Sequence, residues 1–509
     1  MKRIAGWLGI IGVSLALNAP AHSARLPSLG EAQVWSMSQE QRLGTSIKSS
    51  LYASDRVWSD PVLEDYVRRV WHTLFTSARA QGLLSDDLVE GLPWVQLVIK
   101  DASMNAFAMP GGVVGVHLGL LASGAEVDTL AAVLAHEMSH VSQRHIPRLL
   151  EAQSKLAPLA MGALLVAILV AGQSDNADAA QATIAGSQAV MAQAGINFTR
   201  GMEQEADRMG WQIYTGAGFS PDGFAALFEQ LAQASRLNDD GSNAYLRTHP
   251  LSRERIAEVM ARQTFQTSSP QLGHPHLSAL APWMQARAKV AATTRADDWR
   301  AWMSQAGEWK PSMTADEQIK LYLALNSAVR LGDMDWAWRA IQHLVQLPHK
   351  DAAVDALLNG DWLSIARRLS PPSVDVPAAQ ARVERGLKSE WRGEWLAAVQ
   401  WRIDRGQAEQ VVGALQSKVV TDPLDAEVWA MLALAREAQG QTLRMLRAQA
   451  EAQWARGNAS GAVDRMVAAR EWSAAHPAVD PIEAQVVLTR ERDMRRFLAE
   501  QAAAEASGQ

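Results

Sequence analysis

The 509-residue sequence predicts a mainly α-helical protein, with a small β-sheet in its N-terminal half and an array of helix pairs in its C-terminal half. Three observations lead to this fold class. Apolar residues recur at helical spacing through most of the chain. The run at 94–99 and the segment at 105–116, which has the pattern strand, turn, strand, interrupt this spacing. From about residue 300, turns that contain glycine separate successive helical stretches.

The composition is that of a globular protein, and it excludes several classes of function. Hydrophobic residues make up 48% of the chain and charged residues 20%, which argues against extensive disorder. The formal net charge of -6 argues against nucleic acid as a partner, because phosphate binding needs a basic surface. The chain has no cysteine, so disulfides, cysteine nucleophiles and a lipid-modified N-terminal cysteine are excluded. Any metal must be held by histidines and carboxylates.

The N-terminal residues have the pattern of a secretory signal peptide. Lys2 and Arg3 precede an apolar run at 4–17, and small residues that suit a signal peptidase follow. We predict that a signal peptide at 1–24 is cleaved, with an uncleaved membrane anchor as the alternative. An exported protein without cysteine fits the bacterial periplasm.

Helices are expected on both sides of the predicted sheet. Residues 30–90 have helical periodicity. Ser38 and Gln41 have the spacing of a capping box, and a second helix is expected to start at Pro61 after Asp60. Helix returns at about residue 125 and continues to the end of the chain.

The segment at 158–172 is the most apolar part of the chain after the signal peptide. As a helix, its 15 residues would span about 22 Å, less than the roughly 30 Å hydrocarbon core of a bilayer. We therefore expect a buried helix or a lid over the functional site. An interfacial membrane helix and a full membrane span are the alternatives.

The C-terminal half has the texture of a helical repeat. Gly406 and Gly440 lie in turns 34 residues apart, which is the period of a tetratricopeptide repeat. One helix pair cannot bury its apolar face alone, so stacked pairs predict a tetratricopeptide-like α-solenoid, with a generic helical bundle as the alternative. The expected domains are a catalytic domain at 25–265, a linker at 266–300 and the repeats at 301–509.

The sequence His-Glu-Met-Ser-His at 136–140 is the strongest functional motif. In a helix, His136 and His140 project from one face about 6 Å apart, as two imidazole ligands of a tetrahedral Zn²⁺ would. Glu137 lies roughly 100° around the helix, too far to bind the metal easily but close enough to take a proton from an attacking water. The alternative is a pair of capped histidines on a surface helix.

A zinc site with two histidines needs a third ligand. One large class uses a histidine six residues after the second, but Ile146 stands there, and we assign the neighbouring His145 to the end of the helix. On a later helix, Glu203 and Asp207 share one face. Glu203 can bind zinc while Asp207 accepts the free N–H of a zinc-bound imidazole. Glu205 is expected to be a solvated charge, and a solvated acidic helix is the alternative for the whole segment.

Two further motifs accompany the one at 136–140. They are Glu-Gln-Glu-Ala-Asp at 203–207 and Thr-His-Pro-Leu at 248–251, which is followed by Arg255. Together the motifs resemble the HtpX/CAAX-prenyl-protease type of zinc metallopeptidase. The resemblance implies a helical zincin-type metallopeptidase domain that holds one Zn²⁺ per chain. It assigns His136, His140 and Glu203 as zinc ligands and Glu137 as the general base. We group Asp207, which the spacing places beside a zinc-bound imidazole, with Glu137 as a catalytic residue.

The resemblance also implies roles for residues beyond the zinc ligands. His249 would occupy the fourth zinc position and switch the enzyme off. Asn105 and Ala106 match an edge strand that pairs with substrate backbone by β-addition. Arg255 matches an arginine near the site, and we group it with the substrate-binding residues.

These inferences describe an exported zinc-dependent endopeptidase. The resemblance implies that it degrades misfolded or stalled outer-membrane β-barrel proteins and assists their assembly as a chaperone. Its repeats would bind the outer-membrane assembly machinery, which would make it a periplasmic protein peripheral at the outer membrane. Two alternatives stay open. One is a chaperone or scaffold whose protease site is normally shut, and the other is a membrane-associated protease built around 158–172.

Overall fold

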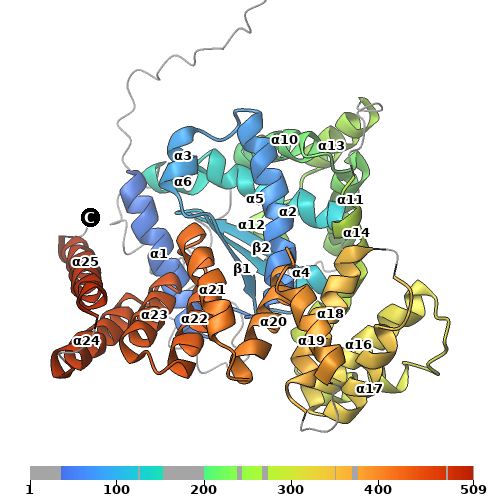
Figure 1. Ribbon diagram of the computed structural model, residues 1–509. Helices are drawn as coiled ribbons and strands as arrows, with labels where there is room; N and C mark the ends of the chain where they lie inside the picture. The colour runs from blue at the N-terminus through green and yellow to red at the C-terminus, as the bar shows by residue number, and fades with distance from the viewer. Residues whose placement is uncertain are drawn as a thin grey trace, which may run out of the picture. The chain divides into compact units, whose positions relative to one another are not determined.

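The computed structural model describes residues 36–123, 126–152, 200–237, 244–265, 273–349, 351–369, 376–476 and 480–507 (Figure 1). The expected signal peptide at 1–24 and the apolar segment at 158–172 lie outside these residues. The fold class is confirmed, because the described residues are mainly helical and include a three-stranded sheet. Within the described ranges, no helix has both the length and the apolarity that a membrane crossing requires.

The N-terminal half begins with helices that start at side-chain caps. Ser36 and Gln39 form the capping box of the first helix, so the predicted box at Ser38 and Gln41 is wrong. The chain offers the Ser-x-x-Gln spacing twice, and the helix begins at the first of the two. The second helix begins after Asp60, as predicted. The helices of this half are α1 (Met37–Ala53), α2 (Pro61–Ala80), α3 (Asp86–Gly91), α4 (Leu118–Ala122), α5 (Val127–Ser142), α6 (His145–Ala152), α10 (Arg200–Gly216), α11 (Pro221–Leu237), α12 (Ala244–Thr248) and α13 (Arg253–Phe265).

A three-stranded sheet packs against α2 and α5 (Figure 1). Its strands, in the spatial order β1-β3-β2, are β1 (Val95–Ile99), β2 (Ala106–Met109) and β3 (Val113–His117). The central β3 pairs in parallel with β1, with Val95 opposite Val113. It pairs antiparallel with β2, with Ala106 opposite Val116. The predicted strands are therefore confirmed, and β2 lies at the edge of the sheet.

The centre of the N-terminal half is α5, whose residues from Thr129 to Val141 are all buried. It packs against α2, α10 and α11. At Gly210 of α10, an added Cβ would lie 3.2 Å from the backbone of His136. Glycine at this position lets α10 bring its acidic residues next to the histidines of α5.

The C-terminal half is an array of helices (Figure 1). Gly406, Gly440 and Gly457, in the turns after α20, α22 and α23, have φ angles of 70°, 69° and 82°, a left-handed conformation that favours glycine. Helices α22, α23 and α24 pack against one another in succession. This stacking agrees with the expected solenoid, while the tetratricopeptide assignment stays a prediction. The helices are α14 (Pro275–Ala292), α15 (Ala296–Ser304), α16 (Ala315–Leu331), α17 (Met334–Leu344), α18 (Ala352–Ala366), α19 (Val376–Gly386), α20 (Arg392–Asp404), α21 (Glu409–Thr421), α22 (Ala426–Ala438), α23 (Thr442–Ala455), α24 (Ala459–Ala475) and α25 (Pro481–Ser507).

The stretch 266–300, which we expected to be a linker, contains a helix of the packed core instead. α14 packs against α4, α16 and α18 and buries Leu280, Trp283 and Met284. The expected linker is therefore wrong, and Pro282 lies inside the helix without ending it. Burial of the apolar face outweighs the hydrogen bond that a proline removes. The helices on either side of residue 265 therefore share one core.

Charged side chains join the repeat helices to the first two helices. Arg392, at the start of α20, lies 2.8 Å from Asp425 Oδ1 and 3.4 Å from Glu64 Oε2 of α2. Lys48 of α1 donates a hydrogen bond to the carbonyl oxygen of Ala455, the last residue of α23. These contacts hold the repeat helices against α1 and α2.

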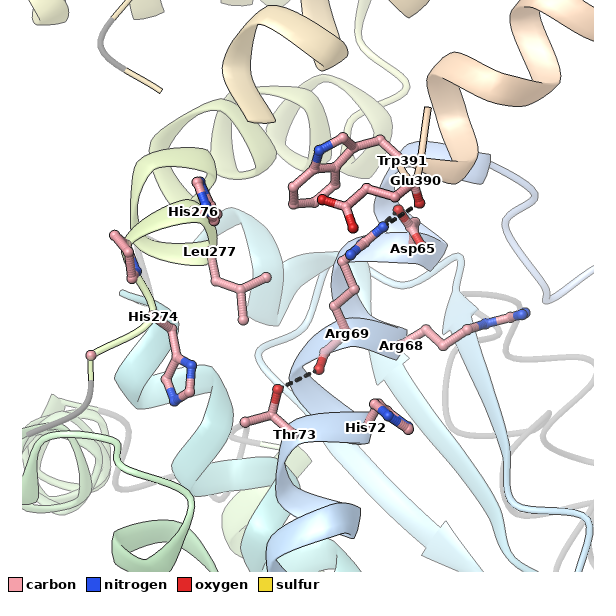
Figure 2. A pocket seen from close by; sticks show the side chains of 12 residues that line it. Asp65, Arg68, Arg69, His72, Thr73, His274, His276, Leu277, Glu390 and Trp391 are labelled. Carbon is pink, nitrogen blue, oxygen red and sulfur yellow. Dashed lines mark hydrogen bonds and ion pairs between the residues drawn. The ribbon is translucent and has the colours of Figure 1, made fainter. Parts of the chain in front are cut away.

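A hollow of about 450 Å³ lies at the same junction, between α2, the start of α14 and the residues that precede α20 (Figure 2). The guanidinium carbon of Arg69 lies 3.9 Å from the ring centroid of Trp391. His274 and His276, across the hollow, complete its polar lining. His136 and His140 do not line this hollow.

The half-buried Glu64 side chain predicts a pH dependence of stability. Burial raises the pKa of Glu64 from 4.5 to about 7; Arg392 opposes this rise and Glu427 adds to it. A raised folded-state pKa means that the protonated carboxyl favours folding. This contribution is fully present below about pH 4.5 and is lost as the pH rises through about 7. Glutamine does not ionise, so Glu64→Gln should not lose this stability as the pH rises.

We expect Glu64→Gln to gain stability relative to wild type between about pH 5 and about pH 8. Urea unfolding at both pH values measures the difference. The exposed Glu90→Gln, which makes the same chemical change at the surface, is the control. A wild type and a Glu64→Gln variant with the same pH dependence would contradict the prediction.

Candidate metal centre

Two imidazole rings project from the same face of α5, with their Nε2 atoms next to each other. His136 and His140 are one helical turn apart, and their Nε2 atoms lie 3.0 Å from each other. Both side chains are buried, with 2% of their surface exposed. Two nitrogens bound to one tetrahedral Zn²⁺ at 2.0–2.1 Å would lie about 3.3 Å apart, so the observed spacing fits a shared metal.

Two further residues from distant parts of the chain complete the cluster. Glu203 of α10 places Oε1 3.5 Å from His140 Nε2 and Oε2 3.6 Å from His136 Nε2. His249, directly after α12, places Nδ1 3.1 Å from Glu203 Oε1 and 3.4 Å from His136 Nε2. One ligand atom from each of the four residues lies within 4.8 Å of the others. The structure thus brings together the three expected ligands and His249.

The donor set suits a divalent metal such as zinc. Three imidazoles and one carboxylate are ligands that Zn²⁺ commonly takes, and four donors match its usual coordination number. All four residues are buried, so a bound ion would be largely shielded from solvent. The residues that would hold the metal are His136, His140 and Glu203, with His249 in the fourth position.

Asp207 and Arg255 contact members of the four-residue cluster without belonging to it. Asp207 Oδ1 lies 3.0 Å from His136 Nδ1, and Arg255 binds both oxygens of Asp207 at 2.6 and 2.9 Å. The third guanidinium nitrogen of Arg255, Nη1, lies 2.6 Å from Glu203 Oε2. Arg255 is 3% exposed. The grouping of Arg255 with the substrate-binding residues stays a prediction, while the structure shows that its guanidinium neutralises two buried carboxylates. The contact between Asp207 and His136 Nδ1 orients the His136 ring.

These contacts govern the protonation of the site. Burial lowers the pKa of His136, but hydrogen bonds to Asp207 and Glu203 outweigh burial and raise the pKa of His136 to about 9. Burial raises the pKa of Asp207, yet Arg255 and His136 bring it below its ordinary value. Burial together with the neighbouring His136 holds the pKa of His140 well below its ordinary value. The two carboxylates thus stay ionised beside the histidines.

Glu137 lies beside the cluster and is not one of its four members. Its side chain is 1% exposed, and its Oε1 is 3.5 Å from Nε2 of His249. Among the described residues, Glu137 Oε1 has no hydrogen-bond partner. A buried carboxylate oxygen without a partner next to a metal cluster is placed to accept a proton from a water molecule.

The structure also shows residues that the sequence analysis misjudged. His145 is fully buried, and its Nδ1 lies 2.9 Å from His140 Nδ1. Glu205, expected to be solvated, lies 3.2 Å from His145 Nε2. Burial lowers the pKa of His145, while Glu205 opposes this effect. Tyr245, which the sequence analysis did not consider, stacks on His249 with ring centroids 4.6 Å apart. The one signal in the sequence was that His145 directly precedes Ile146, the position at which one large class of zinc sites has its third ligand.

Asn105 and Ala106, two of the three expected substrate-binding residues, lie at the edge of the sheet. Ala106 is the first residue of β2, and Asn105 precedes it. The Asn105 carbonyl accepts a hydrogen bond from the His117 N–H, while Asn105 Oδ1 is buried and has no hydrogen-bond partner among the described residues. The other end of β2, at Met109, lines a small hollow with His140. The edge strand thus runs close to the metal cluster.

A comparison with known protein families finds one that is similar to part of the chain. Residues 66–263 match peptidase family M48. This range contains the sheet and all four residues of the metal cluster. This part of the chain is therefore similar to peptidases of family M48. The resemblance to a metallopeptidase family that the three motifs indicated is therefore confirmed.

Relatives of this part of the chain include proteins named for a role in β-barrel assembly. The chain is 34% identical over 241 residues to the beta-barrel assembly-enhancing protease of Yersinia pestis. It is 33% identical over 239 residues to the protein of the same name from Escherichia coli (strain K12). Each match covers 47% of this chain and 47% of the relative, so the chain spans about half the length of these relatives.

The metalloprotease LoiP of Escherichia coli (strain K12) is 27% identical over 249 residues. That match covers 49% of this chain and 87% of the relative. Similarity to these proteins thus extends over about half of this chain, and the M48 match at 66–263 lies in its N-terminal half.

Proposed function

We propose that the protein is a zinc-dependent endopeptidase. The observation that carries this proposal is the buried cluster of His136, His140, Glu203 and His249 in the region similar to family M48, with the Glu137 carboxylate beside it. When bound, zinc would supply Lewis-acid polarisation of the scissile carbonyl and of the attacking water. The remaining chemistry falls to side chains of the chain.

Each of these side chains has a role that its contacts support. Glu137 accepts the proton of the attacking water and delivers it to the leaving amine. Asp207 accepts a hydrogen bond from His136 Nδ1, so that His136 Nε2 faces the metal. Arg255 keeps Asp207 and Glu203 ionised and fixed. The edge of β2 offers backbone groups to an extended substrate next to this machinery.

We further propose that the substrates are misfolded or stalled outer-membrane β-barrel proteins. Support comes from the names of two relatives and from the expected signal peptide at 1–24, which would place the protein in the periplasm. An unfolded β-strand is also the shape that an edge strand such as β2 can pair with. The repeat helices would bind the outer-membrane assembly machinery and assist assembly as a chaperone does.

The direct test uses the purified full-length protein. We expect about one zinc per chain by elemental analysis and cleavage of casein that a chelator abolishes and added zinc restores. In cells, a Glu137→Gln protein should leave a stalled β-barrel protein undegraded. A protein that binds no zinc, or that cleaves with full activity in the presence of chelator, would contradict the proposal.

A second candidate, a chaperone whose protease site is shut, is favoured by one contact. His249 Nδ1 reaches Glu203 Oε1 at 3.1 Å, and Tyr245 stacks on the other side of the His249 ring. In this position His249 fills the place that a substrate or water would need. A closed site of this kind opens when the loop that carries His249 moves.

His249→Ala should therefore raise the basal rate of casein cleavage, because the fourth metal position becomes accessible. The variant should keep its zinc, since His136, His140 and Glu203 remain. Initial rates per bound zinc measure the effect, and His117→Ala, a buried histidine outside the cluster, is the control. An unchanged or lower rate would show that His249 contributes to substrate binding or catalysis and does not close the site.

A further inference from the structure

The chain turns sharply where α5 ends. This turn places His145 next to His140, one of the four residues of the candidate metal site. Helix α5 stops at Gln143, and Arg144 adopts a left-handed conformation with φ of 50°. Such a residue reverses the direction of the chain after a helix. The ring of His145 consequently lies 4.9 Å from that of His140, centroid to centroid, and is fully buried.

The hydrogen bonds of His140 and His145 form a chain that leads away from the metal position. His140 Nε2 faces the cluster, so its Nδ1 faces His145 Nδ1 at 2.9 Å. His145 Nε2 in turn lies 3.2 Å from Glu205 Oε2. Arg148 Nη1 donates to the same oxygen at 3.1 Å. Four side chains are thus connected in the order His140, His145, Glu205, Arg148.

One placement of protons satisfies this chain when a metal is bound. A metal on His140 Nε2 leaves the proton of that ring on Nδ1, which donates to His145 Nδ1. His145 then carries its own proton on Nε2, which donates to the Glu205 carboxylate. The carboxylate accepts from His145 and Arg148 together. Every buried polar atom of the two rings has a role in this arrangement.

We infer that His145 and Glu205 are positioning residues that hold the His140 ring in the tautomer and orientation that bind zinc. The inference rests on the proposed zinc peptidase function. His136 has its own support in Asp207 and Arg255, so the two histidine ligands are each held by a separate carboxylate and arginine. Asp207 touches its histidine directly, whereas Glu205 acts through His145.

The competing explanation is that His145 only fills space at the end of α5. The two explanations predict opposite rankings of two variants. In His145→Asn, the side-chain oxygen can stand near the position of Nδ1 and still accept from His140. In His145→Phe, the ring fills the space but accepts nothing. A positioning role therefore favours Asn over Phe, and a packing role favours Phe over Asn.

The test is the zinc dissociation constant of the full-length protein, measured by competition with a chromophoric chelator. We expect His145→Phe to weaken zinc binding about 10–100-fold, as loss of such outer partners does, and His145→Asn to weaken it less. His117→Phe, which removes another buried histidine, should leave zinc affinity unchanged. Circular dichroism checks that each variant is folded. Wild-type affinity in His145→Phe, or weaker binding in His145→Asn than in His145→Phe, would overturn the inference.

Glu205 provides a second readout, because its effect should pass through His145. Glu205→Gln should weaken zinc binding, and His145→Phe combined with Glu205→Gln should bind zinc no more weakly than His145→Phe alone. Independent, additive losses would overturn the proposed order of the chain. Zinc affinity does not depend on cleavage. A wild type that binds zinc but cleaves nothing would refute the proposed function, while the zinc affinities of the variants would still test this inference. A wild type that binds no zinc would overturn both.

Discussion

Glu137→Gln should lower the rate of peptide cleavage by about 10²–10⁴-fold while the protein keeps about one zinc per chain. Glutamine has the shape of glutamate but cannot accept the proton of the attacking water. Glu137 stands beside the metal cluster and is not a member of it, so the substitution leaves all four metal-binding residues in place. Casein cleavage and elemental analysis of the same preparation measure both quantities.

Two variants make this result specific to the base. Glu203→Ala should lose zinc as well as activity, because Glu203 is a member of the cluster. Glu126→Gln makes the same chemical change at the exposed N-cap of α5 and should change neither quantity. Near-normal turnover in Glu137→Gln would exclude Glu137 as the general base. Loss of zinc in that variant would instead make Glu137 part of the metal site.

Sequence reasoning could place the inner residues of the site because their signals are local. His136 and His140 are separated by one helical turn, as are Glu203 and Asp207, so each pair must share a face once its helix forms. The contact between the two faces depends on Gly210, which lets α10 approach α5 closely. Spacing does not encode that contact; we inferred it because a site with two histidines needs a third ligand, and the family resemblance supported it.

The outer residues could not be predicted in the same way. His145 reaches His140 only because Arg144 turns the chain after α5, and no helical spacing describes such a turn. Glu205 meets His145 across 60 residues of sequence, on a helix whose charged residues look solvated. A contact of this kind depends on how α6 and α10 pack, which a single sequence does not contain.

The fold shows the same division between local and distant information. The strands and the start of α2 depend on neighbouring residues, and both were predicted correctly. The stretch 266–300 was expected to be a linker, yet it contains α14, which continues through Pro282. Packing against α4 stabilises that helix in spite of the proline. Tertiary contacts here override a local signal.

Arg255→Met should destabilise the protein by about 3–5 kcal/mol, because it leaves two buried carboxylates without their common cation. Arg255 binds both oxygens of Asp207 and also contacts Glu203, and all three side chains are almost completely buried. Methionine retains much of the volume of the aliphatic stem, so the loss is mainly electrostatic. Arg253→Met, two residues away on the exposed side of α13, is the matched control.

The pH dependence of this loss identifies its cause. Arg255 holds the pKa of Asp207 below its ordinary value of 3.8, in spite of burial, so its contribution is present above about pH 4 and is lost as the pH falls below this value. The difference in unfolding free energy between wild type and Arg255→Met should therefore be largest near neutral pH and should shrink in acid. Added zinc should recover part of the loss, since it neutralises Glu203 but not Asp207. Urea unfolding across this pH range, with and without zinc, measures both effects. A loss of less than about 1 kcal/mol, or one that is independent of pH, would show that packing, and not charge, explains why Arg255 is buried at the metal centre.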